Sequence, residues 1–296
     1  MFDVIIIGAG PAGLSAALML GRCRRRVLLC DSDRPRNAAS RALHGYLTRD
    51  GIAPMELRRL GRRELRRYAV TYRRTMVTSV ARRRGRFVAV DRQGRRAEAP
   101  FLILATGVVD ELPPIDGFRR FYGAGVFHCP YCDGWEQQDR RLAAYGRGSS
   151  GATLALALRG WSRDVALLTD GPPRMMPATL ERLKRHGVEL HAGRIARVEG
   201  RRVLERVVFR DGTSLRRDAV FFQGSKFQRS RLCAALGCAF TSKGVVRVRR
   251  FETAGPEGLF VIGDASAGTQ LAITSAAEGA RAAVAVNESL NRLRLR

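Results

Sequence analysis

The sequence predicts an α/β protein with two doubly wound domains, the second inserted into the first. A short β-branched run, a glycine-rich turn and a helix-forming stretch follow one another twice, first from Val4–Ile7 and again from Leu142–Tyr145. The length of 296 residues also suits two domains, at about 150 residues each. A last strand at Leu259–Ile262 and a helix from about Ile273 to Leu290 follow the second copy and complete the first domain. We therefore expect two Rossmann-like domains, each with three layers.

The first copy of the pattern supplies a parallel sheet and its helices. Short continuous apolar runs are typical of strands buried in parallel sheets. The expected strands are Val4–Ile7, Val27–Cys30 and Phe101–Leu104, and short strands and turns are expected over Arg73–Arg96. Helices are expected over Leu14–Leu20 and Leu57–Tyr68. In the second helix, leucines share one face and six arginines, Arg58 among them, cover the other, which we interpret as a solvated face rather than a phosphate-binding one.

The second copy follows a linker that Pro113, Pro114 and Gly117 mark. Its expected strands are Leu142–Tyr145, Val165–Leu168, Val203–Phe209 and Ala219–Phe222, and its expected helix is Ala152–Leu158. Gly244 begins the return to the first domain, with a strand expected at Val245–Val248. The predicted organisation is a first domain part at residues 1–115, an inserted domain at 116–245 and a second part of the first domain at 246–296.

Charge is the unusual feature of the composition. The 53 basic and 27 acidic residues give a formal net charge of +26, and all but three of the basic residues are arginine. Such an excess can indicate a nucleic-acid or anionic-membrane partner. The arginines are scattered along the chain, and no nucleic-acid-binding motif accompanies them. We therefore favour a compositional habit in which arginine fills exposed cationic positions, and expect no nucleic-acid partner.

Neither a secretory leader nor a membrane span is expected. The N-terminal segment M-F-D-V-I-I-I lacks the basic region of a signal peptide. The uncharged run Val4–Gly21 is at the short limit for a membrane helix, and Pro11 and several glycines would break such a helix. Six cysteines with only one close pair do not form the framework of a disulfide-rich secreted protein. A reducing cytoplasm is the expected location.

The first glycine motif is G-A-G-P-A-G at residues 8–13. Gly8 allows the tight turn, Gly10 lets the backbone approach a pyrophosphate, and Gly13 lets helix and strand pack closely. The helix start offers N–H donors and a partial positive charge to the anion. Asp31 ends the next strand, 18 residues after Gly13, where a carboxylate binds an adenosine ribose hydroxyl. This context predicts a bound dinucleotide, and the alternative is a glycine-rich turn without a ligand.

A second glycine motif predicts a second nucleotide site. Gly146, Gly148 and Gly151 also stand between a strand and a helix. Asp170 lies near the end of the following strand, where a carboxylate suits a free ribose hydroxyl and repels a 2′-phosphate. That argues against NADPH, although Arg174 lies close by in sequence and could offset the repulsion. The alternative is an empty or vestigial site.

The strongest chemical signal is Cys129-Pro130-Tyr131-Cys132. Two cysteines at this spacing can close a small disulfide loop and exchange with another dithiol, and the spacing lowers a thiol pKa. A zinc knuckle would need a second ligand pair, and Cys233 and Cys238 are too far apart in sequence to supply one. We expect no metal and favour a redox disulfide over zinc or inert thiols. Asp133, directly after Cys132, can shuttle a proton, and His128 can do so too or can simply pack.

The remaining cysteines are interpreted as buried thiols. Cys23, Cys30, Cys233 and Cys238 all stand among apolar residues. A free cysteine in such surroundings behaves as a small hydrophobic residue.

The sequence resembles the low-molecular-weight thioredoxin reductases, a family of FAD-dependent disulfide oxidoreductases. The resemblance covers nearly the whole chain. It is carried by G-A-G-P-A-G at 8–13, A-T-G at 105–107, C-P-Y-C-D-G at 129–134, the second glycine motif at 146–151, G-D at 263–264 and Q-L-A-I-T-S-A-A-E-G at 270–279. The order and spacing of these motifs are specific.

The resemblance implies a cofactor, a mechanism and an assembly. FAD would lie on the first glycine motif and Asp31. The other residues that the resemblance assigns to cofactor binding are Pro11, Ala12, Arg36, Asn37, Gly107, Gly263, Asp264, Gln270, Leu271 and Ala272. Cys129 and Cys132 would exchange electrons with the flavin, with Asp133 as the acid and base. Relatives are usually homodimers, and NADH or NADPH would occupy the second site.

The departures from the family leave the direction of electron flow open. Thioredoxin reductases carry G-G-Q after the position of Asp31, where this chain has Arg34-Pro35-Arg36-Asn37. They also carry an arginine run for the NADPH 2′-phosphate, where this chain has Thr169-Asp170-Gly171. The segments 35–47 and 129–136 are more similar to the dithiol oxidases of gliotoxin and holomycin biosynthesis, which differ in having His at the position of Asp133. The leading interpretation is a reductase of an external disulfide, in a thioredoxin-like protein or a small molecule. The alternative is an oxidase that passes electrons from a dithiol to oxygen.

Overall fold

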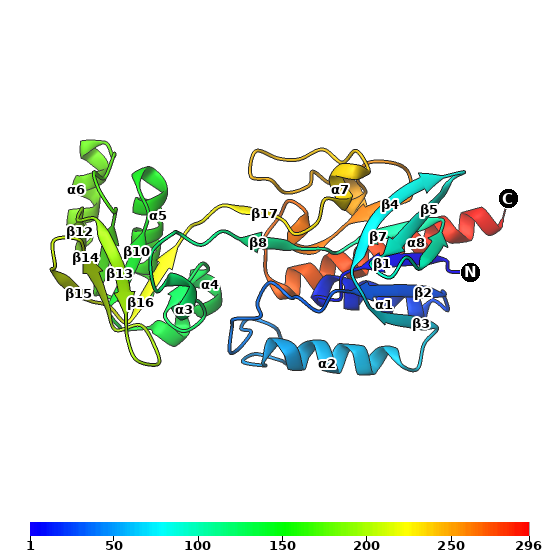
Figure 1. Cartoon of the computed structure of the whole chain (residues 1–296), viewed down its shortest axis with the longest axis horizontal. Helices are drawn as coiled ribbons and strands as arrows, with labels where there is room; N and C mark the ends of the chain where they lie inside the picture. Colours follow the sequence, from blue (N-terminus) through cyan, green and yellow to red (C-terminus); the bar gives the residue numbers. More distant parts are fainter. Residues whose placement is uncertain (296) are drawn as a thin grey trace. The chain divides into compact units, whose positions relative to one another are not determined.

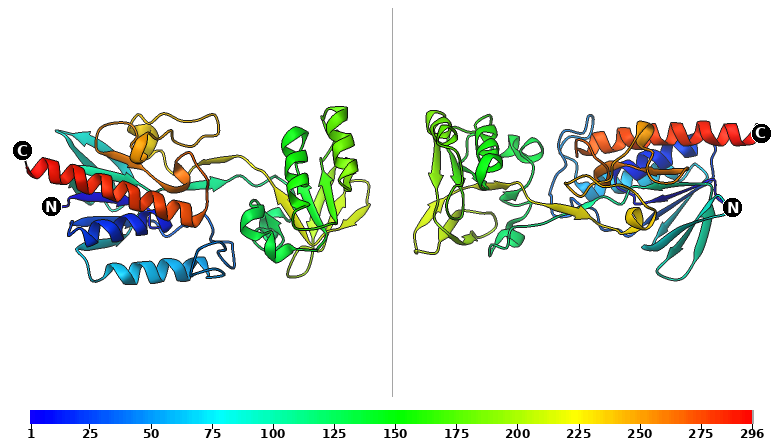
Figure 2. Two further views of the ribbon diagram at one scale, coloured as in Figure 1. Left: turned by 180° about the vertical axis from the view of Figure 1, so that it is seen from behind. Right: turned by 90° about the horizontal axis from the view of Figure 1, so that it is seen from above.

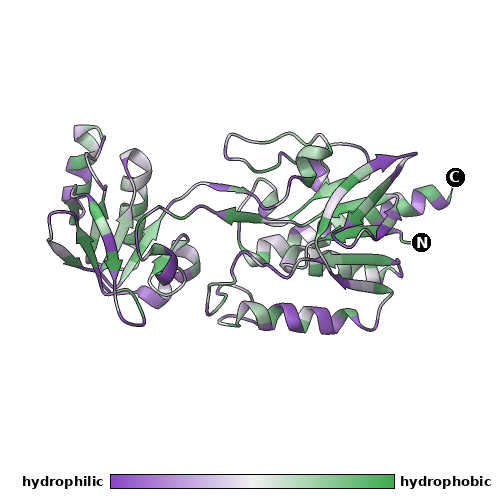
Figure 3. Ribbon diagram, viewed as in Figure 1, coloured by the Kyte–Doolittle hydropathy of each residue, from purple (hydrophilic) through white to green (hydrophobic). Residues whose placement is uncertain are grey.

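A computed structural model describes residues 1–295 of the chain, which divide into two compact units (Figure 1). The first unit comprises Met1–Ala38, Gly45–Asp110 and the chain from Lys226 onward. The second comprises Ala39–His44 and Glu111–Ser225. In both units, the apolar residues follow the central strands (Figure 3).

The first unit is built on a five-stranded parallel sheet. Its strands follow the order β18 (Leu259–Val261), β7 (Phe101–Leu104), β1 (Val4–Ile7), β2 (Val27–Asp31) and β3 (Val70–Arg74). Val4 pairs with Val27 on one side and with Phe101 on the other. This register aligns the carboxyl ends of β1, β2 and β7 at the same edge of the sheet.

Alternating side chains of β1 belong to the two cores of this unit. Val4 and Ile6 pack with helix α1 (Pro11–Arg22) and helix α8 (Ala272–Arg294). Ile5 and Ile7 pack on the other face, against an antiparallel sheet of β4 (Val77–Arg83), β5 (Arg86–Asp91) and β6 (Arg96–Ala99). Because successive side chains of a strand point to opposite faces, β1 contributes to both cores. Figure 2 shows the helices and the antiparallel sheet on opposite sides of the parallel sheet.

The remaining elements of the first unit are short, apart from helix α2 (Pro54–Leu65). Strand β8 (Val108–Asp110) pairs antiparallel with β17 (Lys226–Gln228), where the chain leaves this unit and re-enters it. The others are α7 (Leu232–Ala235) and the 3-10 turns Arg250–Glu252 and Gly263–Ala265.

The second unit repeats the plan of the first. Its parallel sheet has the order β12 (Val188–His191), β11 (Val165–Leu168), β10 (Leu142–Tyr145), β16 (Ala219–Phe222) and β9 (Val126–Phe127). Helices α5 (Gly148–Leu158) and α6 (Pro177–Arg185) pack on one face. On the other lie the antiparallel strands β13 (Ile195–Glu199), β14 (Arg206–Phe209) and β15 (Ser214–Arg216), with α3 (Phe118–Phe121). The short helix α4 (Pro130–Asp133) and the 3-10 turn Trp135–Gln137 follow β9.

The fold class predicted from the sequence is confirmed, and four local expectations are wrong. Cys23 is half-buried rather than buried, because it caps the end of α1. Val245–Val248 is not a strand, because Val246 forms only isolated bridges with Phe240 and Ser266 while its side chain is buried. Strand β14 begins at Arg206 rather than at Val203. Arg58 is buried rather than solvated, since it lies seven residues before the buried Leu65 and so shares its helix face.

The compact units do not follow the predicted domain boundaries of 115/116 and 245/246. They divide at 110/111 and 225/226, because β17 pairs with β8 and Cys233 and Cys238 join the core of the first unit.

Within residues 1–295, no helix has the length and the apolar character that crossing a bilayer requires.

Candidate functional site

The turn after β1 has the geometry of a pyrophosphate cradle. Gly8 has φ +108°, and a Cβ there would lie 2.2 Å from the carbonyl oxygen of Ala105. A Cβ on Gly13 would lie 1.9 Å from the carbonyl oxygen of Gly8, so helix α1 packs closely on the turn. A Cβ on Gly10 would meet nothing within 4 Å. Gly10 is also the N-cap of α1, with Pro11 at its first turn, so free N–H groups border the open space.

Asp31 ends β2 beside this turn, and its carboxylate is fully engaged. Its Oδ1 accepts the N–H of Ala9 at 3.1 Å. Its Oδ2 pairs with the guanidinium of Arg58 and lies 3.4 Å from the hydroxyl of Tyr72. Arg58 also pairs with Asp33 at 2.9 Å. The sequence interpretation found Asp31 but missed Arg58, whose place seven residues before Leu65 was the available signal.

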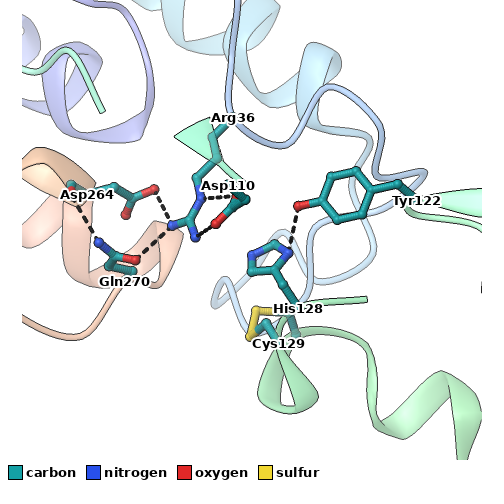
Figure 4. Close-up of a disulfide and its surroundings, with 8 residues drawn as sticks. Arg36, Asp110, Tyr122, His128, Cys129, Asp264 and Gln270 are labelled. Carbon is teal, nitrogen blue, oxygen red and sulfur yellow. Dashed lines mark hydrogen bonds and ion pairs between the residues drawn. A yellow bond between two sulfur atoms is a disulfide. The ribbon is translucent and has the colours of Figure 1, made fainter. Parts of the chain in front are cut away.

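Arg36 joins two carboxylates at the carboxyl edge of the same sheet. Its Nη1 donates to Asp264 Oδ2 and to Gln270 Oε1, both at 3.0 Å, and its Nε donates to Asp110 Oδ2 at 2.7 Å (Figure 4). Gln270 also accepts from Lys226 Nζ at 2.5 Å. Burial lowers the pKa of Lys226, and the charge of Arg36 adds to that effect. Asp110 and Lys226 were not among the residues expected at the site, and no motif marks them.

The backbone around Asp264 is held by helix α8. Gly263 has φ +68°, and its N–H donates to the buried carboxylate of Glu278 at 2.6 Å. Burial raises the pKa of Glu278, although the N–H of Gly263 acts in the opposite direction. Leu271 is the N-cap of α8, and Ala272 is the first residue of that helix. Gln270, directly before the cap, donates from Nε2 to the carbonyl oxygen of Asp264 at 3.0 Å. The predicted residues from Gly263 to Ala272 therefore form one local structure.

The residues of this edge fit a bound FAD. A side chain is missing at Gly10 where the pyrophosphate would approach, and the Oγ1 of Thr106 is buried without a hydrogen-bond partner. Thr106 adjoins the turn, since its backbone nitrogen lies 3.4 Å from where a Cβ of Gly8 would be. Gly107, with φ +65°, has open space at its Cβ position. Asn37 is half-buried one residue after Arg36.

In the second unit, Cys129 and Cys132 form a disulfide, with their Cα atoms 5.3 Å apart. Cys129 is the N-cap of α4, and its carbonyl oxygen accepts the N–H groups of Cys132 and Asp133, both at 3.2 Å. Both cysteines are partly exposed. His128 Nδ1 lies 2.8 Å from the hydroxyl of Tyr122, so this histidine is held by a hydrogen bond (Figure 4).

Asp133 is the titratable group beside the disulfide. Burial raises the pKa of its carboxyl to about 6, Glu136 adds to the rise, and His44 opposes it. His44 Nδ1 and Glu136 Oε1 lie 3.3 Å apart. A carboxyl with a pKa near 6 can hold a proton close to neutral pH and can also release it, which suits an acid and base.

Aromatic side chains border the disulfide. Tyr131 and Trp135 are 81% and 69% exposed. Tyr131 meets Trp161 edge to face, with the ring centroids 5.8 Å apart. Gly134 is required here, because a Cβ would lie 2.8 Å from the ring of Trp161. Trp161 was not singled out in the sequence, since it lies far from the C-P-Y-C motif.

The second glycine turn is formed, but its predicted carboxylate is bound within the protein. A Cβ on Gly151 would lie 2.4 Å from the carbonyl oxygen of Gly146, so helix α5 packs closely on the turn. Asp170 Oδ1 accepts the N–H of Ile195 at 2.8 Å. Asp170 Oδ2 lies 3.4 Å from Nη2 of Arg147 and 3.8 Å from Nη1 of Arg194.

Arg147 covers the end of β11. It is the N-cap residue of α5, and Gly148, which begins the helix, has φ +61°. Its Nε donates to the carbonyl oxygen of Thr169 at 2.6 Å, and its Nη2 donates to that of Asp170. Among the residues described, the cations paired with Asp170 are Arg147 and Arg194, whereas the sequence pointed to Arg174.

Comparisons with known proteins assign the chain to a family. It matches the pyridine nucleotide-disulphide oxidoreductase family over residues 2–280 and belongs to that family. A relative named "Probable thioredoxin reductase" in Arthroderma benhamiae is 31% identical, over 99% of this chain and 81% of its own. The crystal structure of HlmI has a TM-score of 0.95 at 34% identity, covering 99% of this chain and 94% of that one. An oxidoreductase from Agrobacterium tumefaciens has a TM-score of 0.92 at 34% identity, covering 98% of each chain.

The class of protein follows from these findings. The chain is an FAD-dependent disulfide oxidoreductase that resembles thioredoxin reductase. Within residues 1–295, no group of three or more His, Cys, Asp or Glu side chains could hold a metal ion.

The open space at Gly10 leads to a test of the FAD site. Gly10→Leu should fold normally, because its Cβ meets no atom within 4 Å, but should purify without flavin because the side chain fills the pyrophosphate position. Gly13→Ala is the contrasting variant and should lose stability, since its Cβ would lie 1.9 Å from a carbonyl oxygen. Visible absorbance measures flavin and thermal melting measures stability. A yellow Gly10→Leu protein with FAD affinity equal to that of the wild type would contradict this assignment.

Proposed function

We propose that the protein is a reductase that passes electrons from a pyridine nucleotide through FAD to the Cys129–Cys132 disulfide and on to an external disulfide. The observation that carries the proposal is the position of Asp133, next to Cys132 and with a pKa raised to about 6. A carboxyl of this kind can protonate the leaving thiolate when the disulfide is reduced. FAD would supply the two-electron chemistry between the nucleotide and the disulfide.

The two cysteines take different roles in this proposal. Cys132, beside Asp133, would be the cysteine that receives electrons from a bound flavin. Cys129 then attacks the external disulfide, and Cys132 displaces the mixed disulfide to close the pair again. The exposed rings of Tyr131 and Trp135 offer a contact surface to the substrate, whether a thioredoxin-like protein or a small molecule. The family resemblance supports a homodimer, and the cysteine usage supports a cytoplasmic location.

The second glycine turn supports a pyridine nucleotide, and we favour NADH. The carboxylate of Asp170 at the end of β11 suits a free ribose hydroxyl and disfavours a phosphate. Arg147 and Arg194 reduce that penalty, since both lie within ion-pair distance of the carboxylate. The preference for NADH over NADPH is therefore expected to be modest.

One observation favours the alternative, a dithiol oxidase. The side chain of Arg147 is hydrogen-bonded to the carbonyl oxygens of Thr169 and Asp170, and so covers the strand end where an adenosine ribose would bind. If that side chain stays in place, electrons enter from a dithiol substrate and leave to oxygen. Anaerobic mixing of the oxidised protein with NADH, NADPH and a small dithiol, in turn, separates the two functions. Bleaching of the flavin by a nucleotide supports the reductase, and bleaching by the dithiol alone supports the oxidase.

Arg147 provides a variant that probes the nucleotide. Arg147→Ala removes one of two cations beside Asp170, so the preference for NADH over NADPH in flavin reduction should rise about tenfold, which corresponds to about 1.4 kcal/mol. Arg163→Ala, an exposed arginine of the same unit, should leave the preference unchanged. Stopped-flow absorbance measures both rates. An unchanged preference in Arg147→Ala would show that Arg147 does not lie near the bound 2′ position.

The cysteine roles predict two distinct variants. Cys132→Ser should block electron transfer between flavin and disulfide. Cys129→Ser should leave a thiolate beside the flavin, visible as a long-wavelength absorbance band. Cys30→Ala is the control and should retain turnover. Full turnover by the Cys129→Ser, Cys132→Ser double variant would rule out the disulfide as the redox centre.

Asp133 predicts the pH dependence of disulfide reduction. Its carboxyl is protonated below a pKa of about 6, so the rate of the acid-catalysed step should fall as the pH rises through that value. Asp133→Asn should be slower by about 100- to 10,000-fold and should show no inflection near pH 6. Glu136→Gln is the control: it should retain activity but shift the inflection to lower pH, because Glu136 helps to raise the pKa. Single-turnover rates between pH 4.5 and 9 measure this, and an inflection near pH 6 that survives in Asp133→Asn would assign it to another group.

A further inference from the structure

The end of helix α7 brings two cysteines together outside the site described above. The N–H of Gly237 donates to the carbonyl oxygen of Ala234, and the N–H of Cys238 donates to that of Cys233, both at 3.0 Å. Gly237 has φ +71°. These two bonds and the left-handed glycine define a Schellman motif, in which the side chains at the positions of Cys233 and Cys238 characteristically contact each other.

The two thiols are buried and share a hydrogen bond. Cys233 is fully buried and Cys238 is 7% exposed, and both belong to the apolar core beneath the parallel sheet of the first unit. The thiol of Cys233 donates to the sulfur of Cys238, which lowers the pKa of Cys238 and raises that of Cys233. Cys238 is therefore the thiol that ionises first, and its neighbour is already in place.

We propose that Cys233 and Cys238 form a second dithiol, which a hydroperoxide converts into a disulfide independently of Cys129 and Cys132. In the first step the Cys238 thiolate attacks one peroxide oxygen, the O–O bond breaks, and the leaving oxygen takes up a proton. In the second, the sulfur of Cys233 displaces the hydroxyl from the sulfenic acid on Cys238, and that hydroxyl leaves with the Cys233 proton as water. Two thiols are oxidised to one disulfide, and hydrogen peroxide is reduced to two molecules of water.

Cys238 is the more accessible residue of the pair, because it is 7% exposed whereas Cys233 is fully buried. Its sulfur is closely packed, since a Cβ on Gly255 would lie only 3.3 Å from it. We therefore expect a small oxidant to reach Cys238 before Cys233. Cys30 in the same apolar core differs, because burial raises the pKa of its thiol to about 11 and keeps it protonated. The proposal does not depend on the direction of electron flow at Cys129 and Cys132.

The sequence offers a direct test on the unaltered protein. Trypsin cleaves after Arg231 and Lys243, so the peptide 232–243 contains Cys233 and Cys238 and no other cysteine. The holoenzyme is treated with hydrogen peroxide, denatured, alkylated and digested without reductant. The expected product is an unalkylated peptide, two hydrogen masses lighter than the dithiol, which reverts on treatment with dithiothreitol. Recovery of a doubly alkylated peptide, or of a sulfinic acid without disulfide, overturns the proposal.

Variants supply the control. In the Cys129→Ser, Cys132→Ser background four thiols remain, and peroxide should reduce the count to two. Adding Cys30→Ala leaves three thiols before treatment, and peroxide should still remove two of them. Adding Cys233→Ser keeps a hydroxyl donor beside Cys238 but removes the second thiol, so it should abolish disulfide formation and leave a sulfenic acid on Cys238 for a trapping reagent. An equal loss of thiols in the Cys233→Ser protein would show that the oxidation occurs elsewhere.

Discussion

The parallel pairing of β1, β2, β7 and β18 is the constraint on which the first site depends. Because carboxyl ends of parallel strands meet at one edge of a sheet, four segments far apart in sequence end side by side. They are the glycine turn after β1, Asp31 in β2, the segment Ala105–Gly107 after β7 and Gly263-Asp264 after β18. Each contributes a small residue or a carboxylate rather than an apolar side chain, so the edge stays open to a ligand.

Two arginines, Arg58 buried and Arg36 partly buried, make this arrangement of carboxylates possible. Arg58 pairs with Asp31 and Asp33, and Arg36 joins Asp110 to Asp264. Removing one partner of a buried ion pair costs about 3–5 kcal/mol, because the other charge is left without compensation. Arg58 is thus more important to the site than its place in an arginine-rich helix suggests. The high arginine content has at least this specific use, besides its contribution to net charge.

The sequence was sufficient for the features that local chemistry determines. The glycine turns, the strands that flank them and the C-P-Y-C pair each have a pattern that follows from backbone geometry or from thiol chemistry. The contacts of Arg58, Lys226 and Arg147 could not be predicted in the same way, because each depends on which elements pack together. Arg58 was placed on the solvated face because the six arginines of the helix were treated alike, although Arg58 shares the face of Leu65.

The same limit applies to Asp170 and to the pair Cys233 and Cys238. Asp170 was identified from its place after a strand, but the N–H of Ile195 that binds it comes from β13, across a long sequence separation. Cys233 and Cys238 were correctly expected to be buried, yet their pairing follows from the left-handed Gly237 between them. That glycine, placed directly before the second cysteine, was the available signal.

The central claim is that FAD and the Cys129–Cys132 disulfide form one electron-transfer system. An anaerobic titration of the holoenzyme with dithionite, followed by flavin absorbance and by thiol counting, tests it most directly. The account predicts that full reduction takes twice the electrons that the flavin alone accepts, and that two new thiols form, at Cys129 and Cys132. Full bleaching of the flavin at half that amount, with the disulfide intact, would contradict the account.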